Sequence, residues 1–295
     1  MFDRLMGNFL ISRDKITDNQ LERVYELQGR SRARLGVIAV TEHLMTIPQA
    51  EEINSLQAAH DKRFGDLAVE KGYLTESQVE RLLERQGNEY MSFCQAIVDS
   101  GIMTLDDIYA ETHAYQIQNG LMESEMEALR NNDLDRIVPI FAKDADDDIR
   151  RLFTIAIKTI YRLLDPHISI GYMTKKSSVT GECVGYQAMT GGSGLMTSVS
   201  GSYQDLQSAA MLYTKEEFLE TREDVMDALC ELINCINGLY ATEVSTETLL
   251  VELEPPIYKT TFANIVSTDI CSLPLQVGNA NIFLNISKAE ATELH

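Results

Sequence analysis

The chain has 295 residues, a formal net charge of -20 at pH 7 and a pI near 4.6. That length leaves room for two domains. The acidity excludes non-specific nucleic-acid binding, which needs clustered Lys and Arg. The first residues lack the basic flank and apolar core of a signal peptide. No apolar run approaches the roughly 20 residues that span a bilayer. We therefore expect a cytoplasmic protein without membrane insertion.

The cysteines and histidines show no ligand spacing. Five cysteines form no CxxC pair, and the histidines form no HExxH pair, so we expect reduced thiols and no metal site. There is no Walker loop, dinucleotide fingerprint or nucleophile elbow. We expect this chain to bind no cofactor of these classes.

The N-terminal part is a fourfold repeat. Units of 24 residues begin at positions 5, 34, 63 and 92, so the period is 29. The thirteenth position is always threonine, and the residue three places later is Gln or Asp, which is the pattern of a helix capping box. The four pairs are Thr17 and Gln20, Thr46 and Gln49, Thr75 and Gln78, and Thr104 and Asp107. Each unit is expected to pair a short helical segment with a capped helix, and stacked units would share an all-α core.

The second and third units resemble the MshEN-type domain of type II secretion and pilus ATPases, a tandem of RLGxx…G…L…Q units. The resemblance implies a cyclic di-GMP site. The planar guanidinium of arginine can form paired hydrogen bonds with a phosphate or with the edge of a guanine. Glycine, which has no Cβ, allows a ligand to approach the backbone closely. His43 replaces one glycine of the pattern, and a repeat scaffold that binds no nucleotide is the alternative. The residues carried over are Arg34, Leu35, Gly36, Gln57, Arg63, Gly65, Gly72 and Gln86.

The chain changes character over residues 117–148. ESEMEALRNNDLDRI is charged and KDADDD is an acidic run, so a solvated connector is expected. The predicted boundaries are therefore a repeat domain over 1–116, this linker, and a second domain over 149–290.

The C-terminal part mixes helices and strands. Helices are expected over 152–164, 203–213 and 222–241, and a hairpin turn is expected at Thr190–Gly194. Strands are expected over 167–173, 184–189, 195–199, 249–253, 271–277 and 281–286. This order predicts an α+β domain with helices on one face of a mostly antiparallel sheet. Residues 288–295 are assigned no structure.

The long helix at Arg222–Ala241 carries one polar stripe. Its apolar residues recur at helical spacing, while Asp227, Glu231, Asn234 and Gly238 follow at steps of four, three and four. Residues so spaced are neighbours on a helix surface. A solvated helix face is one interpretation, and a functional carboxylate–carboxamide pair is the other.

This half resembles the CheX/CheC family of chemotaxis phosphatases, most closely CheX. The likeness rests on VGYQAMTGGSGLMTSV, ELINCINGLYA and VELEPPIY, and on a closing strand pair. The match is closer to CheX than to CheC because only one Glu-x-x-Asn helix is present, where CheC has two. The resemblance implies that the chain dephosphorylates the aspartyl phosphate of a CheY-like response regulator in two-component signalling. It also implies a homodimer through the sheet.

The implied catalytic residues are Glu231 and Asn234. The partner's receiver domain would supply Mg²⁺ and a lysine, Asn234 would orient the attacking water, and Glu231 would grip a basic group. Asn237 is expected to be a structural neighbour. Two alternatives stay open: a non-catalytic receiver-binding or scaffold module, and a cyclic di-GMP effector whose output is the C-terminal domain.

Overall fold

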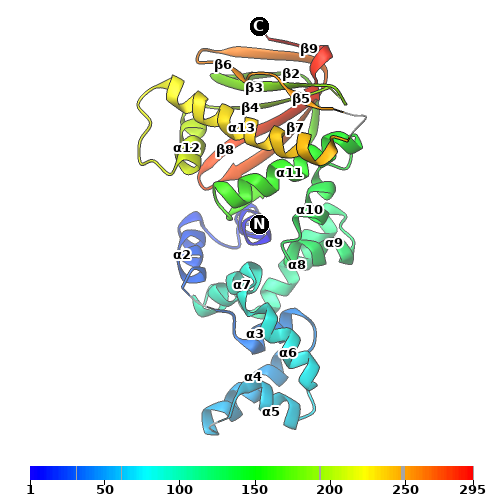
Figure 1. The fold of residues 1–295 in the computed structure, drawn as a ribbon. Helices are drawn as coiled ribbons and strands as arrows, with labels where there is room; N and C mark the ends of the chain where they lie inside the picture. Colours follow the sequence, from blue (N-terminus) through cyan, green and yellow to red (C-terminus); the bar gives the residue numbers. More distant parts are fainter. Residues whose placement is uncertain (31, 61, 193, 247–249, 295) are drawn as a thin grey trace. The chain divides into compact units, whose positions relative to one another are not determined.

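The computed structural model describes residues 1–30, 32–60, 62–192, 194–246 and 250–294. Ser193 of the expected turn, Leu249 of the expected strand and His295 of the expected tail lie outside the described residues. The chain divides into two compact units, Met1–Asn132 and Asp133–His295, and each is described separately below (Figure 1).

The described part of the first unit is helical. Its elements are α1 (Phe2–Ser12), α2 (Asp18–Gln28), α3 (Leu35–Thr41), α4 (Ile47–Ala59), α5 (Phe64–Glu70), α6 (Glu76–Glu84), the 3-10 helix η1 (Arg85–Gly87), α7 (Glu89–Asp99), α8 (Leu105–Asn119) and α9 (Glu123–Arg130). Capping boxes open α2, α4, α6 and α8 at the four predicted threonines. Those four helix starts are confirmed. Each threonine satisfies a backbone N–H that the helix leaves unpaired.

The turn before each capped helix contains a residue in the left-handed backbone conformation. The tenth position of every 24-residue segment has a positive φ, at Asp14 (56°), His43 (57°), Gly72 (72°) and Gly101 (69°). Glycine adopts this conformation freely, whereas Asp and His adopt it less readily. His43 therefore keeps the backbone of the glycine that it replaces, and it adds an imidazole ring at that turn.

Residues 117–148 contain helices and not only a solvated connector. They hold the end of α8, then α9, α10 (Leu134–Phe141) and the start of α11. Met126 and Leu129 of α9, and Ile137 and Val138 of α10, are fully buried. The charges of this stretch occupy the outer side of short amphipathic helices, which is why the sequence suggested a connector. The division between the two compact units falls inside it, after Asn132.

The second unit is an α+β fold. After α10 it contains α11 (Asp147–Leu163), β1 (Ile168–Ile170), β2 (Thr174–Gly181), β3 (Cys183–Thr190), β4 (Leu195–Gly201), α12 (Tyr203–Thr214), α13 (Arg222–Val244), β5 (Glu252–Leu253), β6 (Ile257–Lys259), β7 (Ala263–Val277), β8 (Ala280–Lys288), the 3-10 helix η2 (Ala289–Ala291) and β9 (Thr292–Leu294). The three predicted helices and the hairpin between β3 and β4 are confirmed.

Every strand pair of the described sheet is antiparallel. The strand order is β1-β7-β8-β4-β3-β5, with β2 and β9 also on β7 and β6 on β3. Helices α12 and α13 pack together, α13 lies over β3 and β4, and α12 lies over β8 (Figure 1). Alternate residues of a strand point to opposite faces. Gly185 and Gln187 of β3 therefore face α13, while Val184 and Tyr186 face away.

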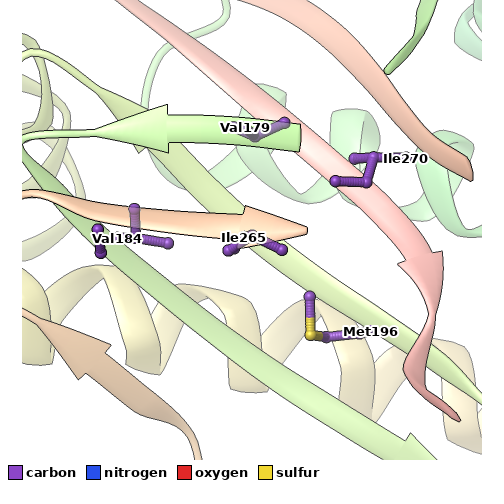
Figure 2. Close-up of a cluster of buried hydrophobic side chains, with 6 residues drawn as sticks. Val179, Val184, Met196, Ile265 and Ile270 are labelled. Carbon is purple, nitrogen blue, oxygen red and sulfur yellow. The ribbon is translucent and has the colours of Figure 1, made fainter. Parts of the chain in front are cut away.

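The face turned away from α13 is covered by the sheet itself. Val184, Met196, Val179, Ile265 and Ile270 form a buried cluster there (Figure 2). They come from β3, β4, β2 and the first half of β7, so the long β7 brings β2 across the other strands. The sequence did not indicate β2, β6, β9 or the first half of β7. The reason for β2 is plain, since TKKSSVTG buries only Val179 and Gly181.

The capping boxes give a direct stability test in the first unit. Thr75→Ala removes the side-chain acceptor of the Gln78 N–H and should lower the free energy of unfolding by about 1 kcal/mol. Ser55→Ala, which removes a mid-helix hydroxyl bonded to the Glu51 carbonyl, is the matched control and should change it by less than about 0.5 kcal/mol. Urea unfolding of both variants measures this. Equal effects would show that the cap does not stabilise α6.

Candidate functional site

The candidate site is on α13, whose start is fixed by a capping box. The Thr221 hydroxyl accepts from the Asp224 N–H, and the Asp224 carboxylate accepts from the Thr221 N–H. Apolar residues at helical spacing, from Val225 to Tyr240, bury one side of the helix. The other side carries the predicted stripe: Asp227 and Glu231 are exposed, and Asn234 and Gly238 are partly exposed.

The orientation of the Asn234 amide is determined by two neighbouring groups. Gln187 Nε2 donates to the backbone carbonyl of Glu254 and to Asn234 Oδ1, both at 2.8 Å. A carbonyl oxygen only accepts hydrogen bonds, so the Gln187 atom that faces Glu254 must be the nitrogen. The Asn234 atom that faces this nitrogen must then be Oδ1, and the Asn234 NH2 group points away from Gln187.

The Asn234 NH2 group is open to solvent. Among the described residues it has no acceptor, and Nδ2 is not among the buried unpaired atoms. The oxygen keeps a second lone pair beyond its bond to Gln187. A carboxamide so held can donate to one solvent molecule without rotating.

Asn237 locks Gln187 from the other side. Asn237 Nδ2 donates to Gln187 Oε1 at 2.9 Å, and Thr197 Oγ1 donates to Asn237 Oδ1 at 2.7 Å. Asn237 and Thr197 are 0% exposed and Gln187 is 1% exposed. Asn237 is therefore a structural neighbour, as predicted. The hydrogen bonds run from Thr197 through Asn237 to Gln187 and end at Asn234.

Glycine in β3 lets the strand approach the helix closely enough for this chain of bonds. A Cβ atom at Gly185 would stand 3.0 Å from the Met226 methyl and 3.1 Å from the Cys230 sulfur. Both distances are tighter than ordinary van der Waals contact. Two residues further along the same face, the Gln187 amide meets the two asparagines of α13.

Glu231 lies one helical turn before Asn234, at the edge of an acidic hollow of about 700 Å³ between the end of α12, the following loop and α13. Burial, followed by electrostatic interaction with the nearby Cys235 and Glu231, raises the pKa of Tyr213, which also lines the hollow. Tyr213 is therefore a neutral hydroxyl at pH 7. The carboxylates of the hollow are Glu216, Glu220, Asp224, Asp227 and Glu231, and none of the described residues that line it is basic.

The residues predicted to bind a ligand in the N-terminal part have different surroundings in the structure. The Arg34 side chain is largely exposed and lies 3.5 Å from Asp99. Arg34 and Gly36 line a hollow of about 490 Å³ together with Gln95 and other residues of the fourth segment. A Cβ at Gly36 would come within 3.1 Å of the Phe64 ring. Leu35 is partly buried beside them.

In the third segment, Gly65, Gly72 and Gln86 have structural roles, whereas Arg63 is exposed like Gln57 of the second segment. A Cβ at Gly65 would stand 2.6 Å from a Val79 methyl, and Gly72 forms the left-handed turn. Gln86 Nε2 donates to the Ala33 carbonyl at 3.2 Å. The close approach at Gly36 and Gly65 is thus to the protein's own side chains, and the cyclic di-GMP site stays a prediction.

Gln187 and Thr197 belong to the site, and the sequence analysis did not single them out. Both are polar residues in otherwise apolar strands, on the face that alternation assigns to the helix. A buried polar residue in a strand requires a partner, and this signal could have linked them to the asparagines of α13.

No family model matches this chain, and no curated protein matches it. Solved structures of CheX-like and CheC-like proteins are similar to about half of it. The chemotaxis protein CheX of Desulfovibrio desulfuricans is 14% identical over 48% of this chain and 99% of its own, with a TM-score of 0.41. CheX in the CheX–CheY–BeF3–Mg²⁺ complex from Borrelia burgdorferi is 20% identical over 48% and 97%, with a TM-score of 0.40.

A CheC-like protein of Shewanella sp. PV-4 is 16% identical over 48% of this chain and 97% of its own, with a TM-score of 0.41. Such values do not assign an activity, which must come from the side chains. Across the described residues, no helix has the length and apolar character to cross a bilayer.

The buried network predicts that Asn237 stabilises the fold and that the exposed Glu231 does not. Asn237→Ala strands the Gln187 oxygen and the Thr197 hydroxyl without partners, and it should lower the free energy of unfolding by about 2 kcal/mol. Glu231→Ala removes an exposed side chain and should change it by less than about 0.5 kcal/mol. Urea unfolding, followed by far-UV circular dichroism, compares the two. A neutral Asn237→Ala variant would contradict the network.

Proposed function

We propose that the C-terminal unit hydrolyses the aspartyl phosphate of a CheY-like receiver domain, with Asn234 orienting the attacking water and Glu231 docking the partner. The observation that carries this proposal is the fixed Asn234 amide, whose NH2 group faces solvent while Gln187 holds its oxygen. The family resemblance of ELINCINGLYA supports the same pair. An exposed helix face without a role would not need a buried network to orient one of its side chains.

The chemistry needs a water in line with the phosphorus. As the resemblance implies, the partner's own Mg²⁺ and lysine hold the phosphoryl group. A carboxamide is not a base, but it can donate to one water and accept from it, as a glutamine does in GTPases. A fixed amide loses no rotational freedom when it engages that water. Positioning of this kind is worth about 3 kcal/mol, or roughly a hundredfold in rate.

Glu231 is suited to docking. Its carboxylate is exposed and borders a hollow with four other carboxylates, so this side of α13 would attract a basic partner surface. It stands one turn from Asn234, and gripping a lysine or arginine there would set the register of the helix on the partner. Gly238, one turn beyond Asn234, has no atom within 4 Å of a Cβ position and leaves room for a partner backbone.

A non-catalytic docking module is the second candidate. The acidic hollow and the open Gly238 favour binding as much as they favour catalysis. The two candidates differ at one atom group: docking needs Glu231 but not the Asn234 NH2 group.

A dephosphorylation assay with a phosphorylated CheY-type receiver distinguishes the two candidates. The wild-type chain should accelerate loss of phosphate, and Asn234→Ala should reduce the saturating rate about a hundredfold while binding is kept. Glu231→Ala should chiefly raise the KM, because it removes a contact made before and during the reaction.

Asp227→Ala serves as the control, since it removes a carboxylate of the same stripe two turns from Asn234. It should keep the saturating rate. Receiver binding with an unchanged decay rate for the wild-type chain would support the docking module and overturn the proposed hydrolysis.

A further inference from the structure

The first unit contains a pocket that the proposed function does not use. It has a volume of about 380 Å³ and lies between the α3–α4 turn, α7, α8 and the end of α9. All of its lining residues belong to the Met1–Asn132 unit. That volume is in the range of small-molecule sites, which combine apolar walls with a few polar groups.

The pocket changes in character with depth. Met45 and Ile108 are buried at 5% and 4% exposure and form apolar wall. Tyr90 and Thr112, at 3% and 6%, lie at the buried end, while Tyr109, at 56%, lies at the mouth. A ligand would therefore enter past an aromatic ring and meet both apolar wall and polar groups at the buried end.

Arg130 is the one cationic side chain that lines the pocket among the described residues, and its side chain is 14% exposed. Asn88 donates to its backbone carbonyl at 2.6 Å, which fixes the end of α9. Its guanidinium pairs through Nη1 with Glu123 at 2.9 Å, and the Glu123 side chain is 66% exposed. A guanidinium has five N–H donors in a fork that matches a carboxylate, so Glu123 leaves most of them available.

The hydroxyl hydrogens of Tyr90 and Thr112, at the buried end, already donate hydrogen bonds within the protein. Thr112 Oγ1 donates to the Ile108 carbonyl at 2.8 Å. Tyr90 is 2.8 Å from Thr112 Oγ1 and must donate to it, because each hydroxyl has a single hydrogen. Arg130 therefore supplies the donors for a ligand at this end, and its charge favours an anionic acceptor.

The mouth of the pocket is formed by two aromatic rings, those of His43 in the left-handed turn and of Tyr109. The His43 ring lies 5.2 Å from the Tyr109 ring, at 83° to it. Asp14, Gly72 and Gly101 hold the same turn position in the other segments, so the imidazole is particular to this pocket. Such a pair presents both a ring face and a ring edge to a planar group.

We propose that this pocket binds a small aromatic monocarboxylate, with Arg130 holding the carboxylate and Tyr109 and His43 contacting the ring. Asp106 also lines the pocket and is exposed, so a second negative charge near the mouth is disfavoured. The net charge of the chain, -20, acts in the same direction. One anionic group at the buried end is thus accepted, and a dianion is not.

The test uses indole-3-propanoate as the probe and its amide, which is nearly the same size and uncharged, as the matched ligand. Isothermal titration of the full chain should give a Kd near or below about 1 mM for the acid, as expected for a ligand of this size. The amide should bind at least tenfold more weakly. Arg130→Gln should weaken binding of the acid at least tenfold, and Tyr109→Ala should weaken both ligands.

Two further variants separate a site from a general effect. Glu123→Gln removes the carboxylate that competes for Arg130 and should tighten binding of the acid severalfold. Arg81→Gln, on the exposed side of α6 and outside the pocket, should leave the Kd unchanged. Thermal unfolding of each variant checks that it is folded.

Several results would overturn the proposal. One is an absence of saturable binding at 10 mM acid, taken as roughly ten times the expected Kd. Equal affinity for the acid and the amide would show that the apolar wall of the pocket accounts for binding and that Arg130 does not contribute. A Glu123→Gln variant that weakens binding would show that the exposed carboxylate is part of the site rather than a competitor.

Discussion

The geometry of the candidate site in the second unit depends on one backbone carbonyl. The oxygen of Glu254 can only accept, so it forces the Gln187 NH2 group to face it. That choice passes to Asn234, whose oxygen must take the second hydrogen of Gln187. Asn237 supports the same orientation from the other side. A side chain on an exposed helix face thus receives a fixed direction from buried groups, without a bond that occupies its own donors.

This arrangement divides the work between two asparagines one turn apart. Asn237 is sealed beneath the helix and contributes to the stability of the strand–helix contact. Asn234 is partly exposed and can contribute to chemistry at the surface. Gly185 favours both roles, because it lets β3 lie close to α13, where a Cβ would press on the side chains of Met226 and Cys230. A functional side chain is held precisely when buried neighbouring groups fix its orientation by packing and hydrogen bonds.

The sequence predicted periodic elements well and context-dependent ones poorly. The capped helices and α13 carry strong local signals, Thr-x-x-Gln boxes and a continuous apolar stripe, and they lie where expected. Strand β2 was missed because its place depends on pairing with distant β7 and hardly on its own residues. Helical spacing placed Glu231 and Asn234 on one stripe, whereas Gln187 is 47 residues from Asn234 in sequence and meets it only where β3 packs against α13. Gly36 and Gly65 lie close to the side chains of Phe64 and Val79, contacts between segments that the sequence did not indicate, and the cyclic di-GMP site stays a prediction.

The most direct test of the central claim is the saturating dephosphorylation rate of Gln187→Glu. A glutamate there has at most one hydrogen, which the Glu254 carbonyl would accept, so none is left for Asn234 Oδ1. The Asn234 amide should then turn its NH2 group inward and present oxygen to solvent. The account predicts a loss of at least tenfold in saturating rate, with receiver binding retained and the fold intact by circular dichroism. A folded Gln187→Glu variant with the wild-type saturating rate would contradict it, because the direction of the Asn234 amide would then be irrelevant to the reaction.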